Sequence, residues 1–151
     1  MPSTRRYTTA FAASEKLYEL TDAAFPGAVQ VSWGYPGVDA GAELVWVGEF
    51  ESADQEPAAI GQGRRNESYH VSIYVDVAME TADPADVNVR VAEHVRVLEE
   101  VLADNPTLDG ALHSDGWAEI ADVETVVATQ PATDTAFAGV ARVRVACRAR
   151  I

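Results

Sequence analysis

The sequence is poor in cysteine and in lysine, with one residue of each, Cys147 and Lys16, among 151. A single cysteine excludes an internal disulfide and any metal site built from several cysteines. No apolar run approaches the roughly 18 residues needed to span a bilayer, and no signal-type apolar segment follows Arg5 and Arg6. We therefore expect a soluble chain without a cleaved leader and without a membrane partner.

Recognisable catalytic and cofactor motifs are also lacking. The glycine-rich turns do not end in the Lys-Ser/Thr pair of a phosphate-binding loop. The three histidines, His70, His94 and His113, have no metal-ligand spacing. His113 is followed by Ser114 and Asp115, but a catalytic triad is defined by spatial geometry and not by adjacency in the sequence. We expect no catalytic residue, no cofactor and no metal, and hence no enzyme.

Acidic residues outnumber basic ones by 24 to 11, which gives a formal net charge of -13. Gripping nucleic acid through its phosphates requires clustered Lys or Arg, so this balance argues against such binding. A surface past which DNA must move without adhering would have this charge. An ordinary soluble protein would have it as well, because high net charge favours solubility.

The hydrophobic pattern predicts an α+β fold. Helical spacing predicts helices over about 11–25 and 84–104, the second with Asp83 as N-cap and Pro84 at its first position. Alternation predicts strands over 28–34, 43–50, 67–79, 117–129 and 137–151, with an irregularity near 120–123. We expect a single domain over residues 1–151, a two-layer sandwich of two helices on a mostly antiparallel sheet of about five strands. Residues 1–9 would be an N-terminal extension, and residues 51–65 a long irregular loop.

The last predicted strand has the most informative pattern. Small and apolar residues from Gly139 to Ile151 share one parity, and Arg142, Arg144, Arg148 and Arg150 share the other. Like charges in a row repel one another unless carboxylates or a partner surface lie opposite. The row is therefore either half of an internal ion-pair face or half of a subunit contact.

The carboxylates and the tryptophans can likewise be interpreted as structural or as functional residues. Asp122 and Glu124 would face Arg142 and Arg144 if the last two strands pair as a hairpin, and the remaining acidic clusters, including Glu49 and Glu51, are expected on solvated surfaces. Core packing is expected for Trp33 and Trp46, whereas Trp117 is a candidate interface anchor. Cys147 has the parity of a buried, unreactive side chain.

Several segments together resemble the tail terminator, or tail-completion, proteins of long-tailed bacteriophages, in particular those of actinobacterial phages and prophages. The resemblance covers nearly the whole chain. It is carried by the N-terminal helix and by residues 29–37, 45–48, 64–69, 104–108 and the closing Arg-Val-Arg-Val pattern at 142–145. These are patterns of fold and turn rather than catalytic signatures.

The resemblance implies a virion protein of the tail neck, assembled in the host cytoplasm. It would form a six-fold homo-oligomeric ring that caps the head-proximal end of the tail tube, ends tube polymerisation and joins the tail to the head connector. Its partners would be the major tail tube protein and the connector or neck proteins, with DNA only passing through the lumen. Candidate subunit-interface residues are Arg142, Arg144, Arg148, Arg150 and Trp117. Candidate tube- or connector-contact residues in the long loop are Glu56, Ile60, Arg64 and Arg65.

Two alternatives remain open at the level of sequence. One is a connector or neck protein on the capsid side. The other is a small cytoplasmic ligand-binding or hydrolytic α+β domain that uses Trp33, Tyr35, His70 and nearby carboxylates around a pocket. A ring component predicts that these residues do not converge on an enclosed site.

Overall fold

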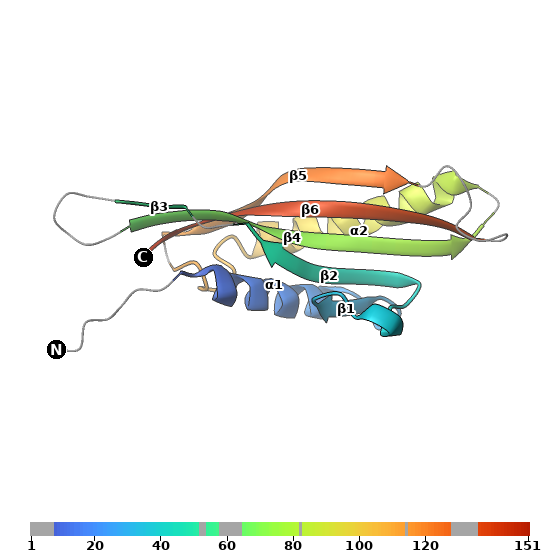
Figure 1. Cartoon of the computed structure of the whole chain (residues 1–151), viewed down its shortest axis with the longest axis horizontal. Coiled ribbons are helices and arrows are strands. Elements are labelled where there is room, and N and C mark those ends of the chain that lie inside the picture. The colour runs from blue at the N-terminus through green and yellow to red at the C-terminus, as the bar shows by residue number, and fades with distance from the viewer. Residues whose placement is uncertain (1–7, 52–53, 58–64, 82, 114, 128–135) are drawn as a thin grey trace.

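The computed structural model describes residues 8–51, 54–57, 65–81, 83–113, 115–127 and 136–151 (Figure 1). Within these residues the chain forms two long helices, six strands and one short 3-10 turn, η1. In chain order the elements are α1 (Ala10–Ala24), β1 (Gln30–Trp33), η1 (Gly37–Asp39), β2 (Glu43–Phe50), β3 (Asp54–Pro57), β4 (Arg65–Glu80), α2 (Pro84–Asp104), β5 (Trp117–Val127) and β6 (Ala136–Arg150). The predicted α+β class is confirmed.

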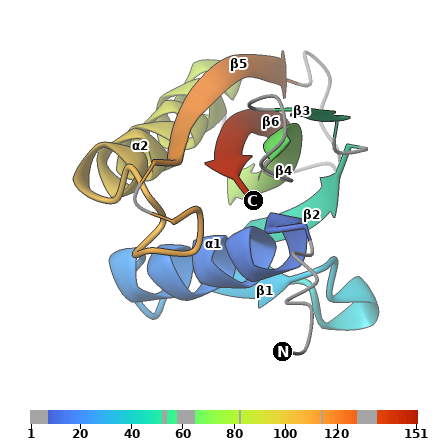
Figure 2. The ribbon, with the colours of Figure 1, turned by 90° about the vertical axis from the view of Figure 1, so that its left-hand side faces the viewer.

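The strands form one mixed sheet in the order β1-β2-β4-β6-β5. Among the described strands only β1 and β2 pair in parallel, and the other pairs are antiparallel. Seen along its strands, the sheet curves around α1 and α2, which lie on its concave side (Figure 2). Neither of these two helices covers the opposite face of the sheet, which is called the open face below.

The expectation of an irregular segment over residues 51–65 is wrong in part, because it contains the short strand β3. This strand pairs antiparallel with the first residues of β4, with Glu56 opposite Asn66 and Pro57 opposite Arg65. The sequence Asp-Gln-Glu-Pro has no apolar alternation, which is the pattern from which a strand is predicted. Thr9, the last residue of the expected N-terminal extension, is buried against the body of the protein, and residues 1–7 of that extension lie outside the described residues.

The core lies between the concave face of the sheet and the two helices. The odd-numbered residues from Ala141 to Ile151 are buried, as their parity predicts, and they face the buried odd-numbered residues of β4 across the ladder. Leu17 of α1 and Leu98 of α2 complete this core. Asp83 caps α2 as predicted, because its Oδ1 accepts a hydrogen bond of 2.9 Å from the Ala85 N–H. Among the described helices, none combines the length and hydropathy that crossing a bilayer requires.

A buried carboxylate ties the start of α1 to β4. Glu67 is completely buried, and its Oε2 accepts hydrogen bonds from the Thr9 N–H at 2.9 Å and from the Thr9 hydroxyl at 3.0 Å. The hydroxyls of Thr9 and Tyr69 lie 2.9 Å apart, within hydrogen-bond distance. A negative charge beside the first turn of a helix is also favoured by the helix dipole. Glu67 therefore fixes where the chain enters α1.

Replacing Glu67 with alanine is expected to lower the free energy of unfolding by about 2 kcal/mol, because two buried donors of Thr9 lose their acceptor. Glu67→Gln retains an acceptor oxygen in the same place and is expected to cost less. Urea unfolding of both variants measures the difference. Equal losses for Ala and Gln would show that the hydrogen bonds to Thr9 do not stabilise the fold.

A second polar cluster joins β2 to α2. Arg90 donates hydrogen bonds from Nε and Nη2 to the two carboxylate oxygens of Glu43, the second at 3.0 Å. The Arg90 hydrogen bonds lower the pKa of Glu43. His94 is buried beside this pair, with Nε2 3.5 Å from Glu43 Oε1, and burial lowers its pKa below the ordinary value of 6.5. The folded chain therefore holds His94 neutral next to an ionised Glu43.

This arrangement predicts a specific pH dependence. Below about pH 6.5 the unfolded chain protonates His94 before the folded chain does, so the free energy of unfolding falls as the pH falls from 7 to 5. The contribution of Glu43 has the same sign but is lost only at lower pH, below its ordinary pKa of 4.5. We expect His94→Leu to flatten the stability profile between pH 7 and 5 and to leave the loss below pH 4.5. Chemical unfolding at several pH values measures this, and equal slopes in both proteins above pH 5 would contradict it.

Candidate functional site

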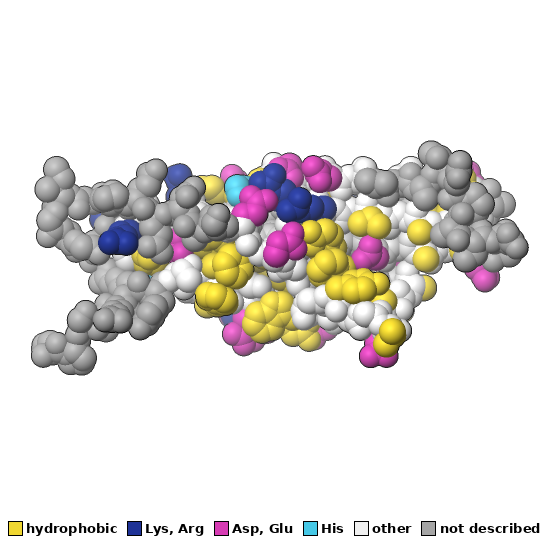
Figure 3. All heavy atoms as spheres, viewed as in Figure 1, with side chains coloured by type: hydrophobic (Ala, Val, Ile, Leu, Met, Phe, Trp, Pro, Cys, Tyr) yellow, Lys and Arg dark blue, Asp and Glu magenta, His cyan; other side chains and the backbone are white. Residues whose placement is uncertain are grey.

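The open face of the sheet is where the predicted site residues gather. Even-numbered residues of β4 and β6 point away from the helices and include Arg142, Arg144, Arg148 and Arg150. Figure 3 shows basic and acidic side chains together near the middle of the molecule, with hydrophobic side chains beside them. The predicted separation of arginines and core residues on β6 is confirmed.

Two bulges direct carboxylates onto this face. In β2 the register shifts between Val47 and Phe50, so that Glu49 and Glu51 turn outward while Phe50 lies opposite buried Val71. In β5 the register shifts between Ile120 and Asp122, which places Asp122 opposite Arg144. A bulge changes which parity faces outward because it inserts an unpaired residue. Acidic residues from both sides therefore meet the arginines of β6.

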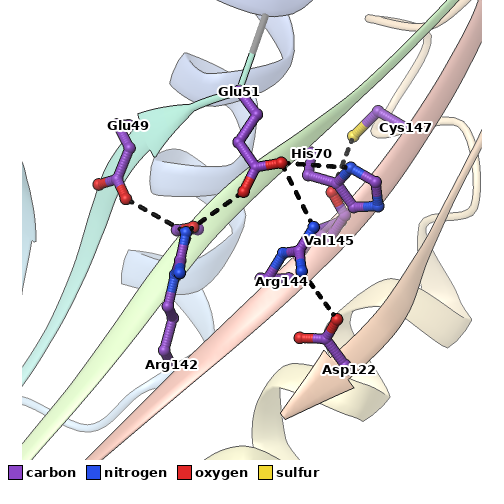
Figure 4. Close-up of polar contacts among 9 residues, drawn as sticks. Glu49, Glu51, His70, Asp122, Arg142, Arg144, Val145 and Cys147 are labelled. Atoms are coloured by element: carbon purple, nitrogen blue, oxygen red, sulfur yellow. Dashed lines mark hydrogen bonds and ion pairs between the residues drawn. The ribbon is translucent and has the colours of Figure 1, made fainter. Parts of the chain in front are cut away.

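These side chains form an ion-pair ladder, which we define as Glu49, Glu51, Arg142, Arg144 and Asp122 (Figure 4). The Arg142 Nη2 lies 3.5 Å from Glu49 Oε1 and 3.4 Å from Glu51 Oε1. Arg144 lies 3.3 Å from Glu51 Oε2 through Nη2 and 3.1 Å from Asp122 Oδ2 through Nη1. The ladder confirms the internal ion-pair interpretation for two of the four arginines. Exposed ion pairs of this kind contribute about 0.2–1 kcal/mol each to stability. The main effect of the ladder is therefore to fix the positions of these five side chains on the open face.

Glu49 and Glu51 are the site residues that sequence reasoning missed. They were expected on a solvated surface, and no sequence signal marks the bulge that turns them toward β6. Glu49 also accepts a hydrogen bond of 2.7 Å from the Tyr74 hydroxyl, which lowers the pKa of the carboxyl. Its position is therefore fixed from β4 as well as from β6.

Arg148 and Arg150 differ from the ladder arginines. Among the described residues, no carboxylate lies within ion-pair distance of either guanidinium group. Arg148 is exposed and lies 5.7 Å over the ring of Trp117, which is its cross-strand neighbour on β5 and is 38% exposed. The Nε atom of Arg150 is buried without a hydrogen-bond partner. This end of the sheet is cationic and aromatic in a chain of net charge -13.

The other two tryptophans divide between the two sides of the sheet. Trp46 was expected in the core, but it is half-buried on the open face. It stacks on Tyr74 with ring centroids 4.1 Å apart and donates a hydrogen bond of 2.8 Å to Asp76 Oδ2. Trp33 was also expected in the core, but it is 53% exposed. It lies at the end of edge strand β1 and donates to the Ser14 hydroxyl of α1 at 3.0 Å, so one ring face remains uncovered.

The residues of the hydrolytic alternative do not converge. His70 is on the open face with Nδ1 4.0 Å from Glu51 Oε2, whereas Trp33 contacts α1 on the opposite side of the sheet. Cys147 lies in the core, where burial raises the pKa of its thiol to about 12. Within the described residues there is no group of three or more His, Cys, Asp or Glu side chains suited to a metal ion.

The predicted tube- and connector-contact residues are placed only in part. Glu56 lies in the backbone ladder of β3, and exposed Arg65 begins β4, where its backbone pairs with Ile151. Ile60 and Arg64 fall outside the described residues. The described ends of this segment adjoin Arg150, which lies opposite Asn66.

The solved structures include one that matches this chain from end to end. It is a chain of the "Virion of native gene transfer agent (GTA) particle", with a TM-score of 0.62, 12% sequence identity, 97% of this chain covered and 100% of that chain covered. The chain shares the fold of a virion component. A second similar structure is the sheath/tube terminator of an extracellular contractile injection system, PVC, in its extended state. The match has 13% sequence identity and covers 93% of this chain and 57% of that chain. Its TM-score of 0.39 is too low to support a conclusion.

No model of a protein family matches the sequence, and neither does any curated protein. The evidence for the shared fold is therefore the structural similarity to the virion component alone. Within that fold, the cationic and aromatic end of the open face is the candidate site, because Arg148, Arg150 and Trp117 have no acidic partner among the described residues.

Proposed function

We propose that this chain is a structural protein of a phage-tail-like particle. It forms a six-fold ring that caps the head-proximal end of the tail tube, ends tube polymerisation and provides the surface to which the head connector binds. The observation that carries the proposal is the end-to-end match to a virion component of the same length class. The role needs no catalytic group and no cofactor, and it places the protein in the neck of the virion after assembly in the host cytoplasm.

Ring closure requires a heterologous interface, in which one surface of a subunit meets a different surface of the next. Arg148, Arg150 and Trp117 supply one such surface. The complementary surface is the exposed acidic side of α2, which includes Glu99 and Glu100. Because the ladder already pairs Arg142 and Arg144 with carboxylates of the same chain, Arg148 and Arg150 are the arginines of β6 that we assign to a neighbour.

The segment between β2 and β4 is the proposed contact to the rest of the tail. Its described strand β3 pairs with the first residues of β4, which pair on their other side with the end of β6 that holds Arg150. The proposed contact residues are Glu56, Ile60 and Arg64 in this segment and Arg65, the first residue of β4. We assign these residues to the major tube protein or to the connector. The acidic surface of the chain would line the passage so that DNA moves through without adhering.

A tube-length assay tests the capping function. The purified chain is added to the polymerising major tube protein of the same particle, and tube lengths are measured by electron microscopy. We expect shorter tubes with the chain located at one end only. An unchanged length distribution would overturn the capping function, and binding along the whole tube would assign the chain to the tube itself.

A further inference from the structure

A continuous groove runs between α2 and the edge strand β5. One half has a volume of about 420 Å³ and is lined by apolar side chains that include Val91, Val95 and Val123. The other half has a volume of about 350 Å³ and is lined by residues that include Leu102, Ala118 and Ile120. Glu99 borders both halves, so the two form one surface, which we call the α2–β5 groove.

The groove adjoins backbone groups that are ready to pair. In the described part of the chain, the only strand that pairs with β5 is β6. The Ala118 N–H on the other edge bonds to the Pro106 carbonyl at 2.7 Å, so the edge open to a further strand begins after Ala118. An extended segment that adds to such an edge gains main-chain hydrogen bonds and places alternate side chains in the adjoining groove. Val123 is 38% exposed there, which leaves apolar surface for a partner to cover.

The charged residues that border the α2–β5 groove favour a segment with basic residues. Glu99 and Glu119 border the half of the groove near the start of β5, and Arg96 borders the other half. Pairing of two β5 edges would place acidic residues of both copies together, which is unfavourable. A segment with basic residues at one end meets no such repulsion.

We propose that the α2–β5 groove binds residues 1–7 of a second copy of this chain, the N-terminal arm, as an added antiparallel strand. The arm, Met-Pro-Ser-Thr-Arg-Arg-Tyr, carries Arg5 and Arg6 at the end nearer the body and no acidic residue. With these arginines beside Glu99 and Glu119, Met1 and Pro2 lie over the valine-lined half. The inference rests on the proposed ring, because it assigns one contact between neighbouring subunits.

The dimensions agree with this placement. Seven extended residues span about 23–25 Å. The groove follows α2 from Asn88 to Ala103, which is about 22 Å at the helical rise per residue. Along β5 it follows Ala118 to Thr125, which is about 23 Å for a strand.

The place where the arm begins also agrees. Thr9 is bonded to Glu67, and Glu67 lies opposite Ala149, between Arg148 and Arg150. The proposed arm therefore begins at the end of the sheet that holds Arg148 and Arg150, on the core side of the sheet and not on the open face. The arm and these two arginines would both reach the α2 side of the same neighbour.

Disulfide trapping tests the arm. Two full-length single variants, Ser3→Cys and Val123→Cys, are mixed under mild oxidation, so that a bond between these positions can form only between copies. The native Cys147 is 2% exposed and does not compete. We expect covalent dimers at about ten times the yield of a control mixture in which Ala24→Cys, on the exposed last residue of α1, replaces Val123→Cys.

A charge exchange and a size measurement complete the test. Glu99→Arg with Glu119→Arg in the groove chain should lower the yield, and Arg5→Glu with Arg6→Glu in the arm chain should restore it. A dimer yield equal to that of the control would overturn the proposed binding of the arm to a second copy. So would a disulfide that forms only within one chain, in a variant that carries both Ser3→Cys and Val123→Cys. Light scattering on the same samples distinguishes binding of the arm in the groove from formation of the proposed ring. Oligomers that form without cross-links would contradict binding of the arm but not the ring. A chain that never associates would contradict both.

Discussion

Replacing Arg148 and Arg150 with glutamate is expected to abolish assembly of the ring and to leave the folded subunit intact. Neither guanidinium group has a carboxylate partner among the described residues, so the substitution breaks no ion pair seen within the chain. The change in the free energy of unfolding should stay within about 1 kcal/mol, the scale of the lost cation–π contact with Trp117. Across the proposed interface, each reversal places a carboxylate against the acidic side of α2. Such like-charge contacts cost several kcal/mol, so self-association should weaken by about 100-fold or more.

Sedimentation at several concentrations measures this weakening. The control is Lys16→Glu on α1, which reverses a positive charge away from both proposed contact surfaces and should not weaken assembly. Equal loss of assembly in the control and in the double variant would mean that total charge, and not this surface, governs association. Retained assembly in the double variant would remove Arg148 and Arg150 from the interface.

Gly116→Ala is expected to have the largest effect on stability, a loss of about 3 kcal/mol, because an added Cβ has no room. That atom would lie 2.1 Å from the Leu112 carbonyl oxygen and 2.8 Å from the Arg148 carbonyl oxygen. Both are backbone atoms, so the start of β5 must move away from β6. Trp117 and Arg148 would lose their alignment at the same time, and assembly should weaken together with stability.

Gly27→Ala is the control for this prediction, because no atom lies within 4 Å of the Cβ position at Gly27. Its effect on urea unfolding should be within about 0.5 kcal/mol. A small effect of both substitutions would show that the loop before β5 yields easily. In that case the position of Trp117 is not fixed by Gly116.

Local patterns in the sequence were sufficient to predict most of the fold. The alternation in β6 and β4 predicted which side chains are buried, because one face of each strand is covered by helices. Asp83 and Pro84 marked the start of α2, since capping depends only on neighbouring residues. The irregularity in β5 was also expected, and with it the ion pair between Asp122 and Arg144.

The features that were missed depend on partners distant in the sequence. The bulge in β2 brings Glu49 and Glu51 to the arginines, and nothing in residues 43–50 alone marks it. Strand β3 forms only because β4 extends far enough to pair with it. Trp33 was expected in the core because its strand alternates, but β1 is a short edge strand and leaves the ring half uncovered.

The central claim is that the chain forms one six-fold ring in the neck of a tailed particle. Quantitative mass spectrometry of purified particles, which counts this chain against the portal and the major tube protein, tests it most directly. We expect half as many copies as of the portal protein. Equal numbers would move the chain to the capsid side of the connector, and its absence from particles would contradict the structural function altogether.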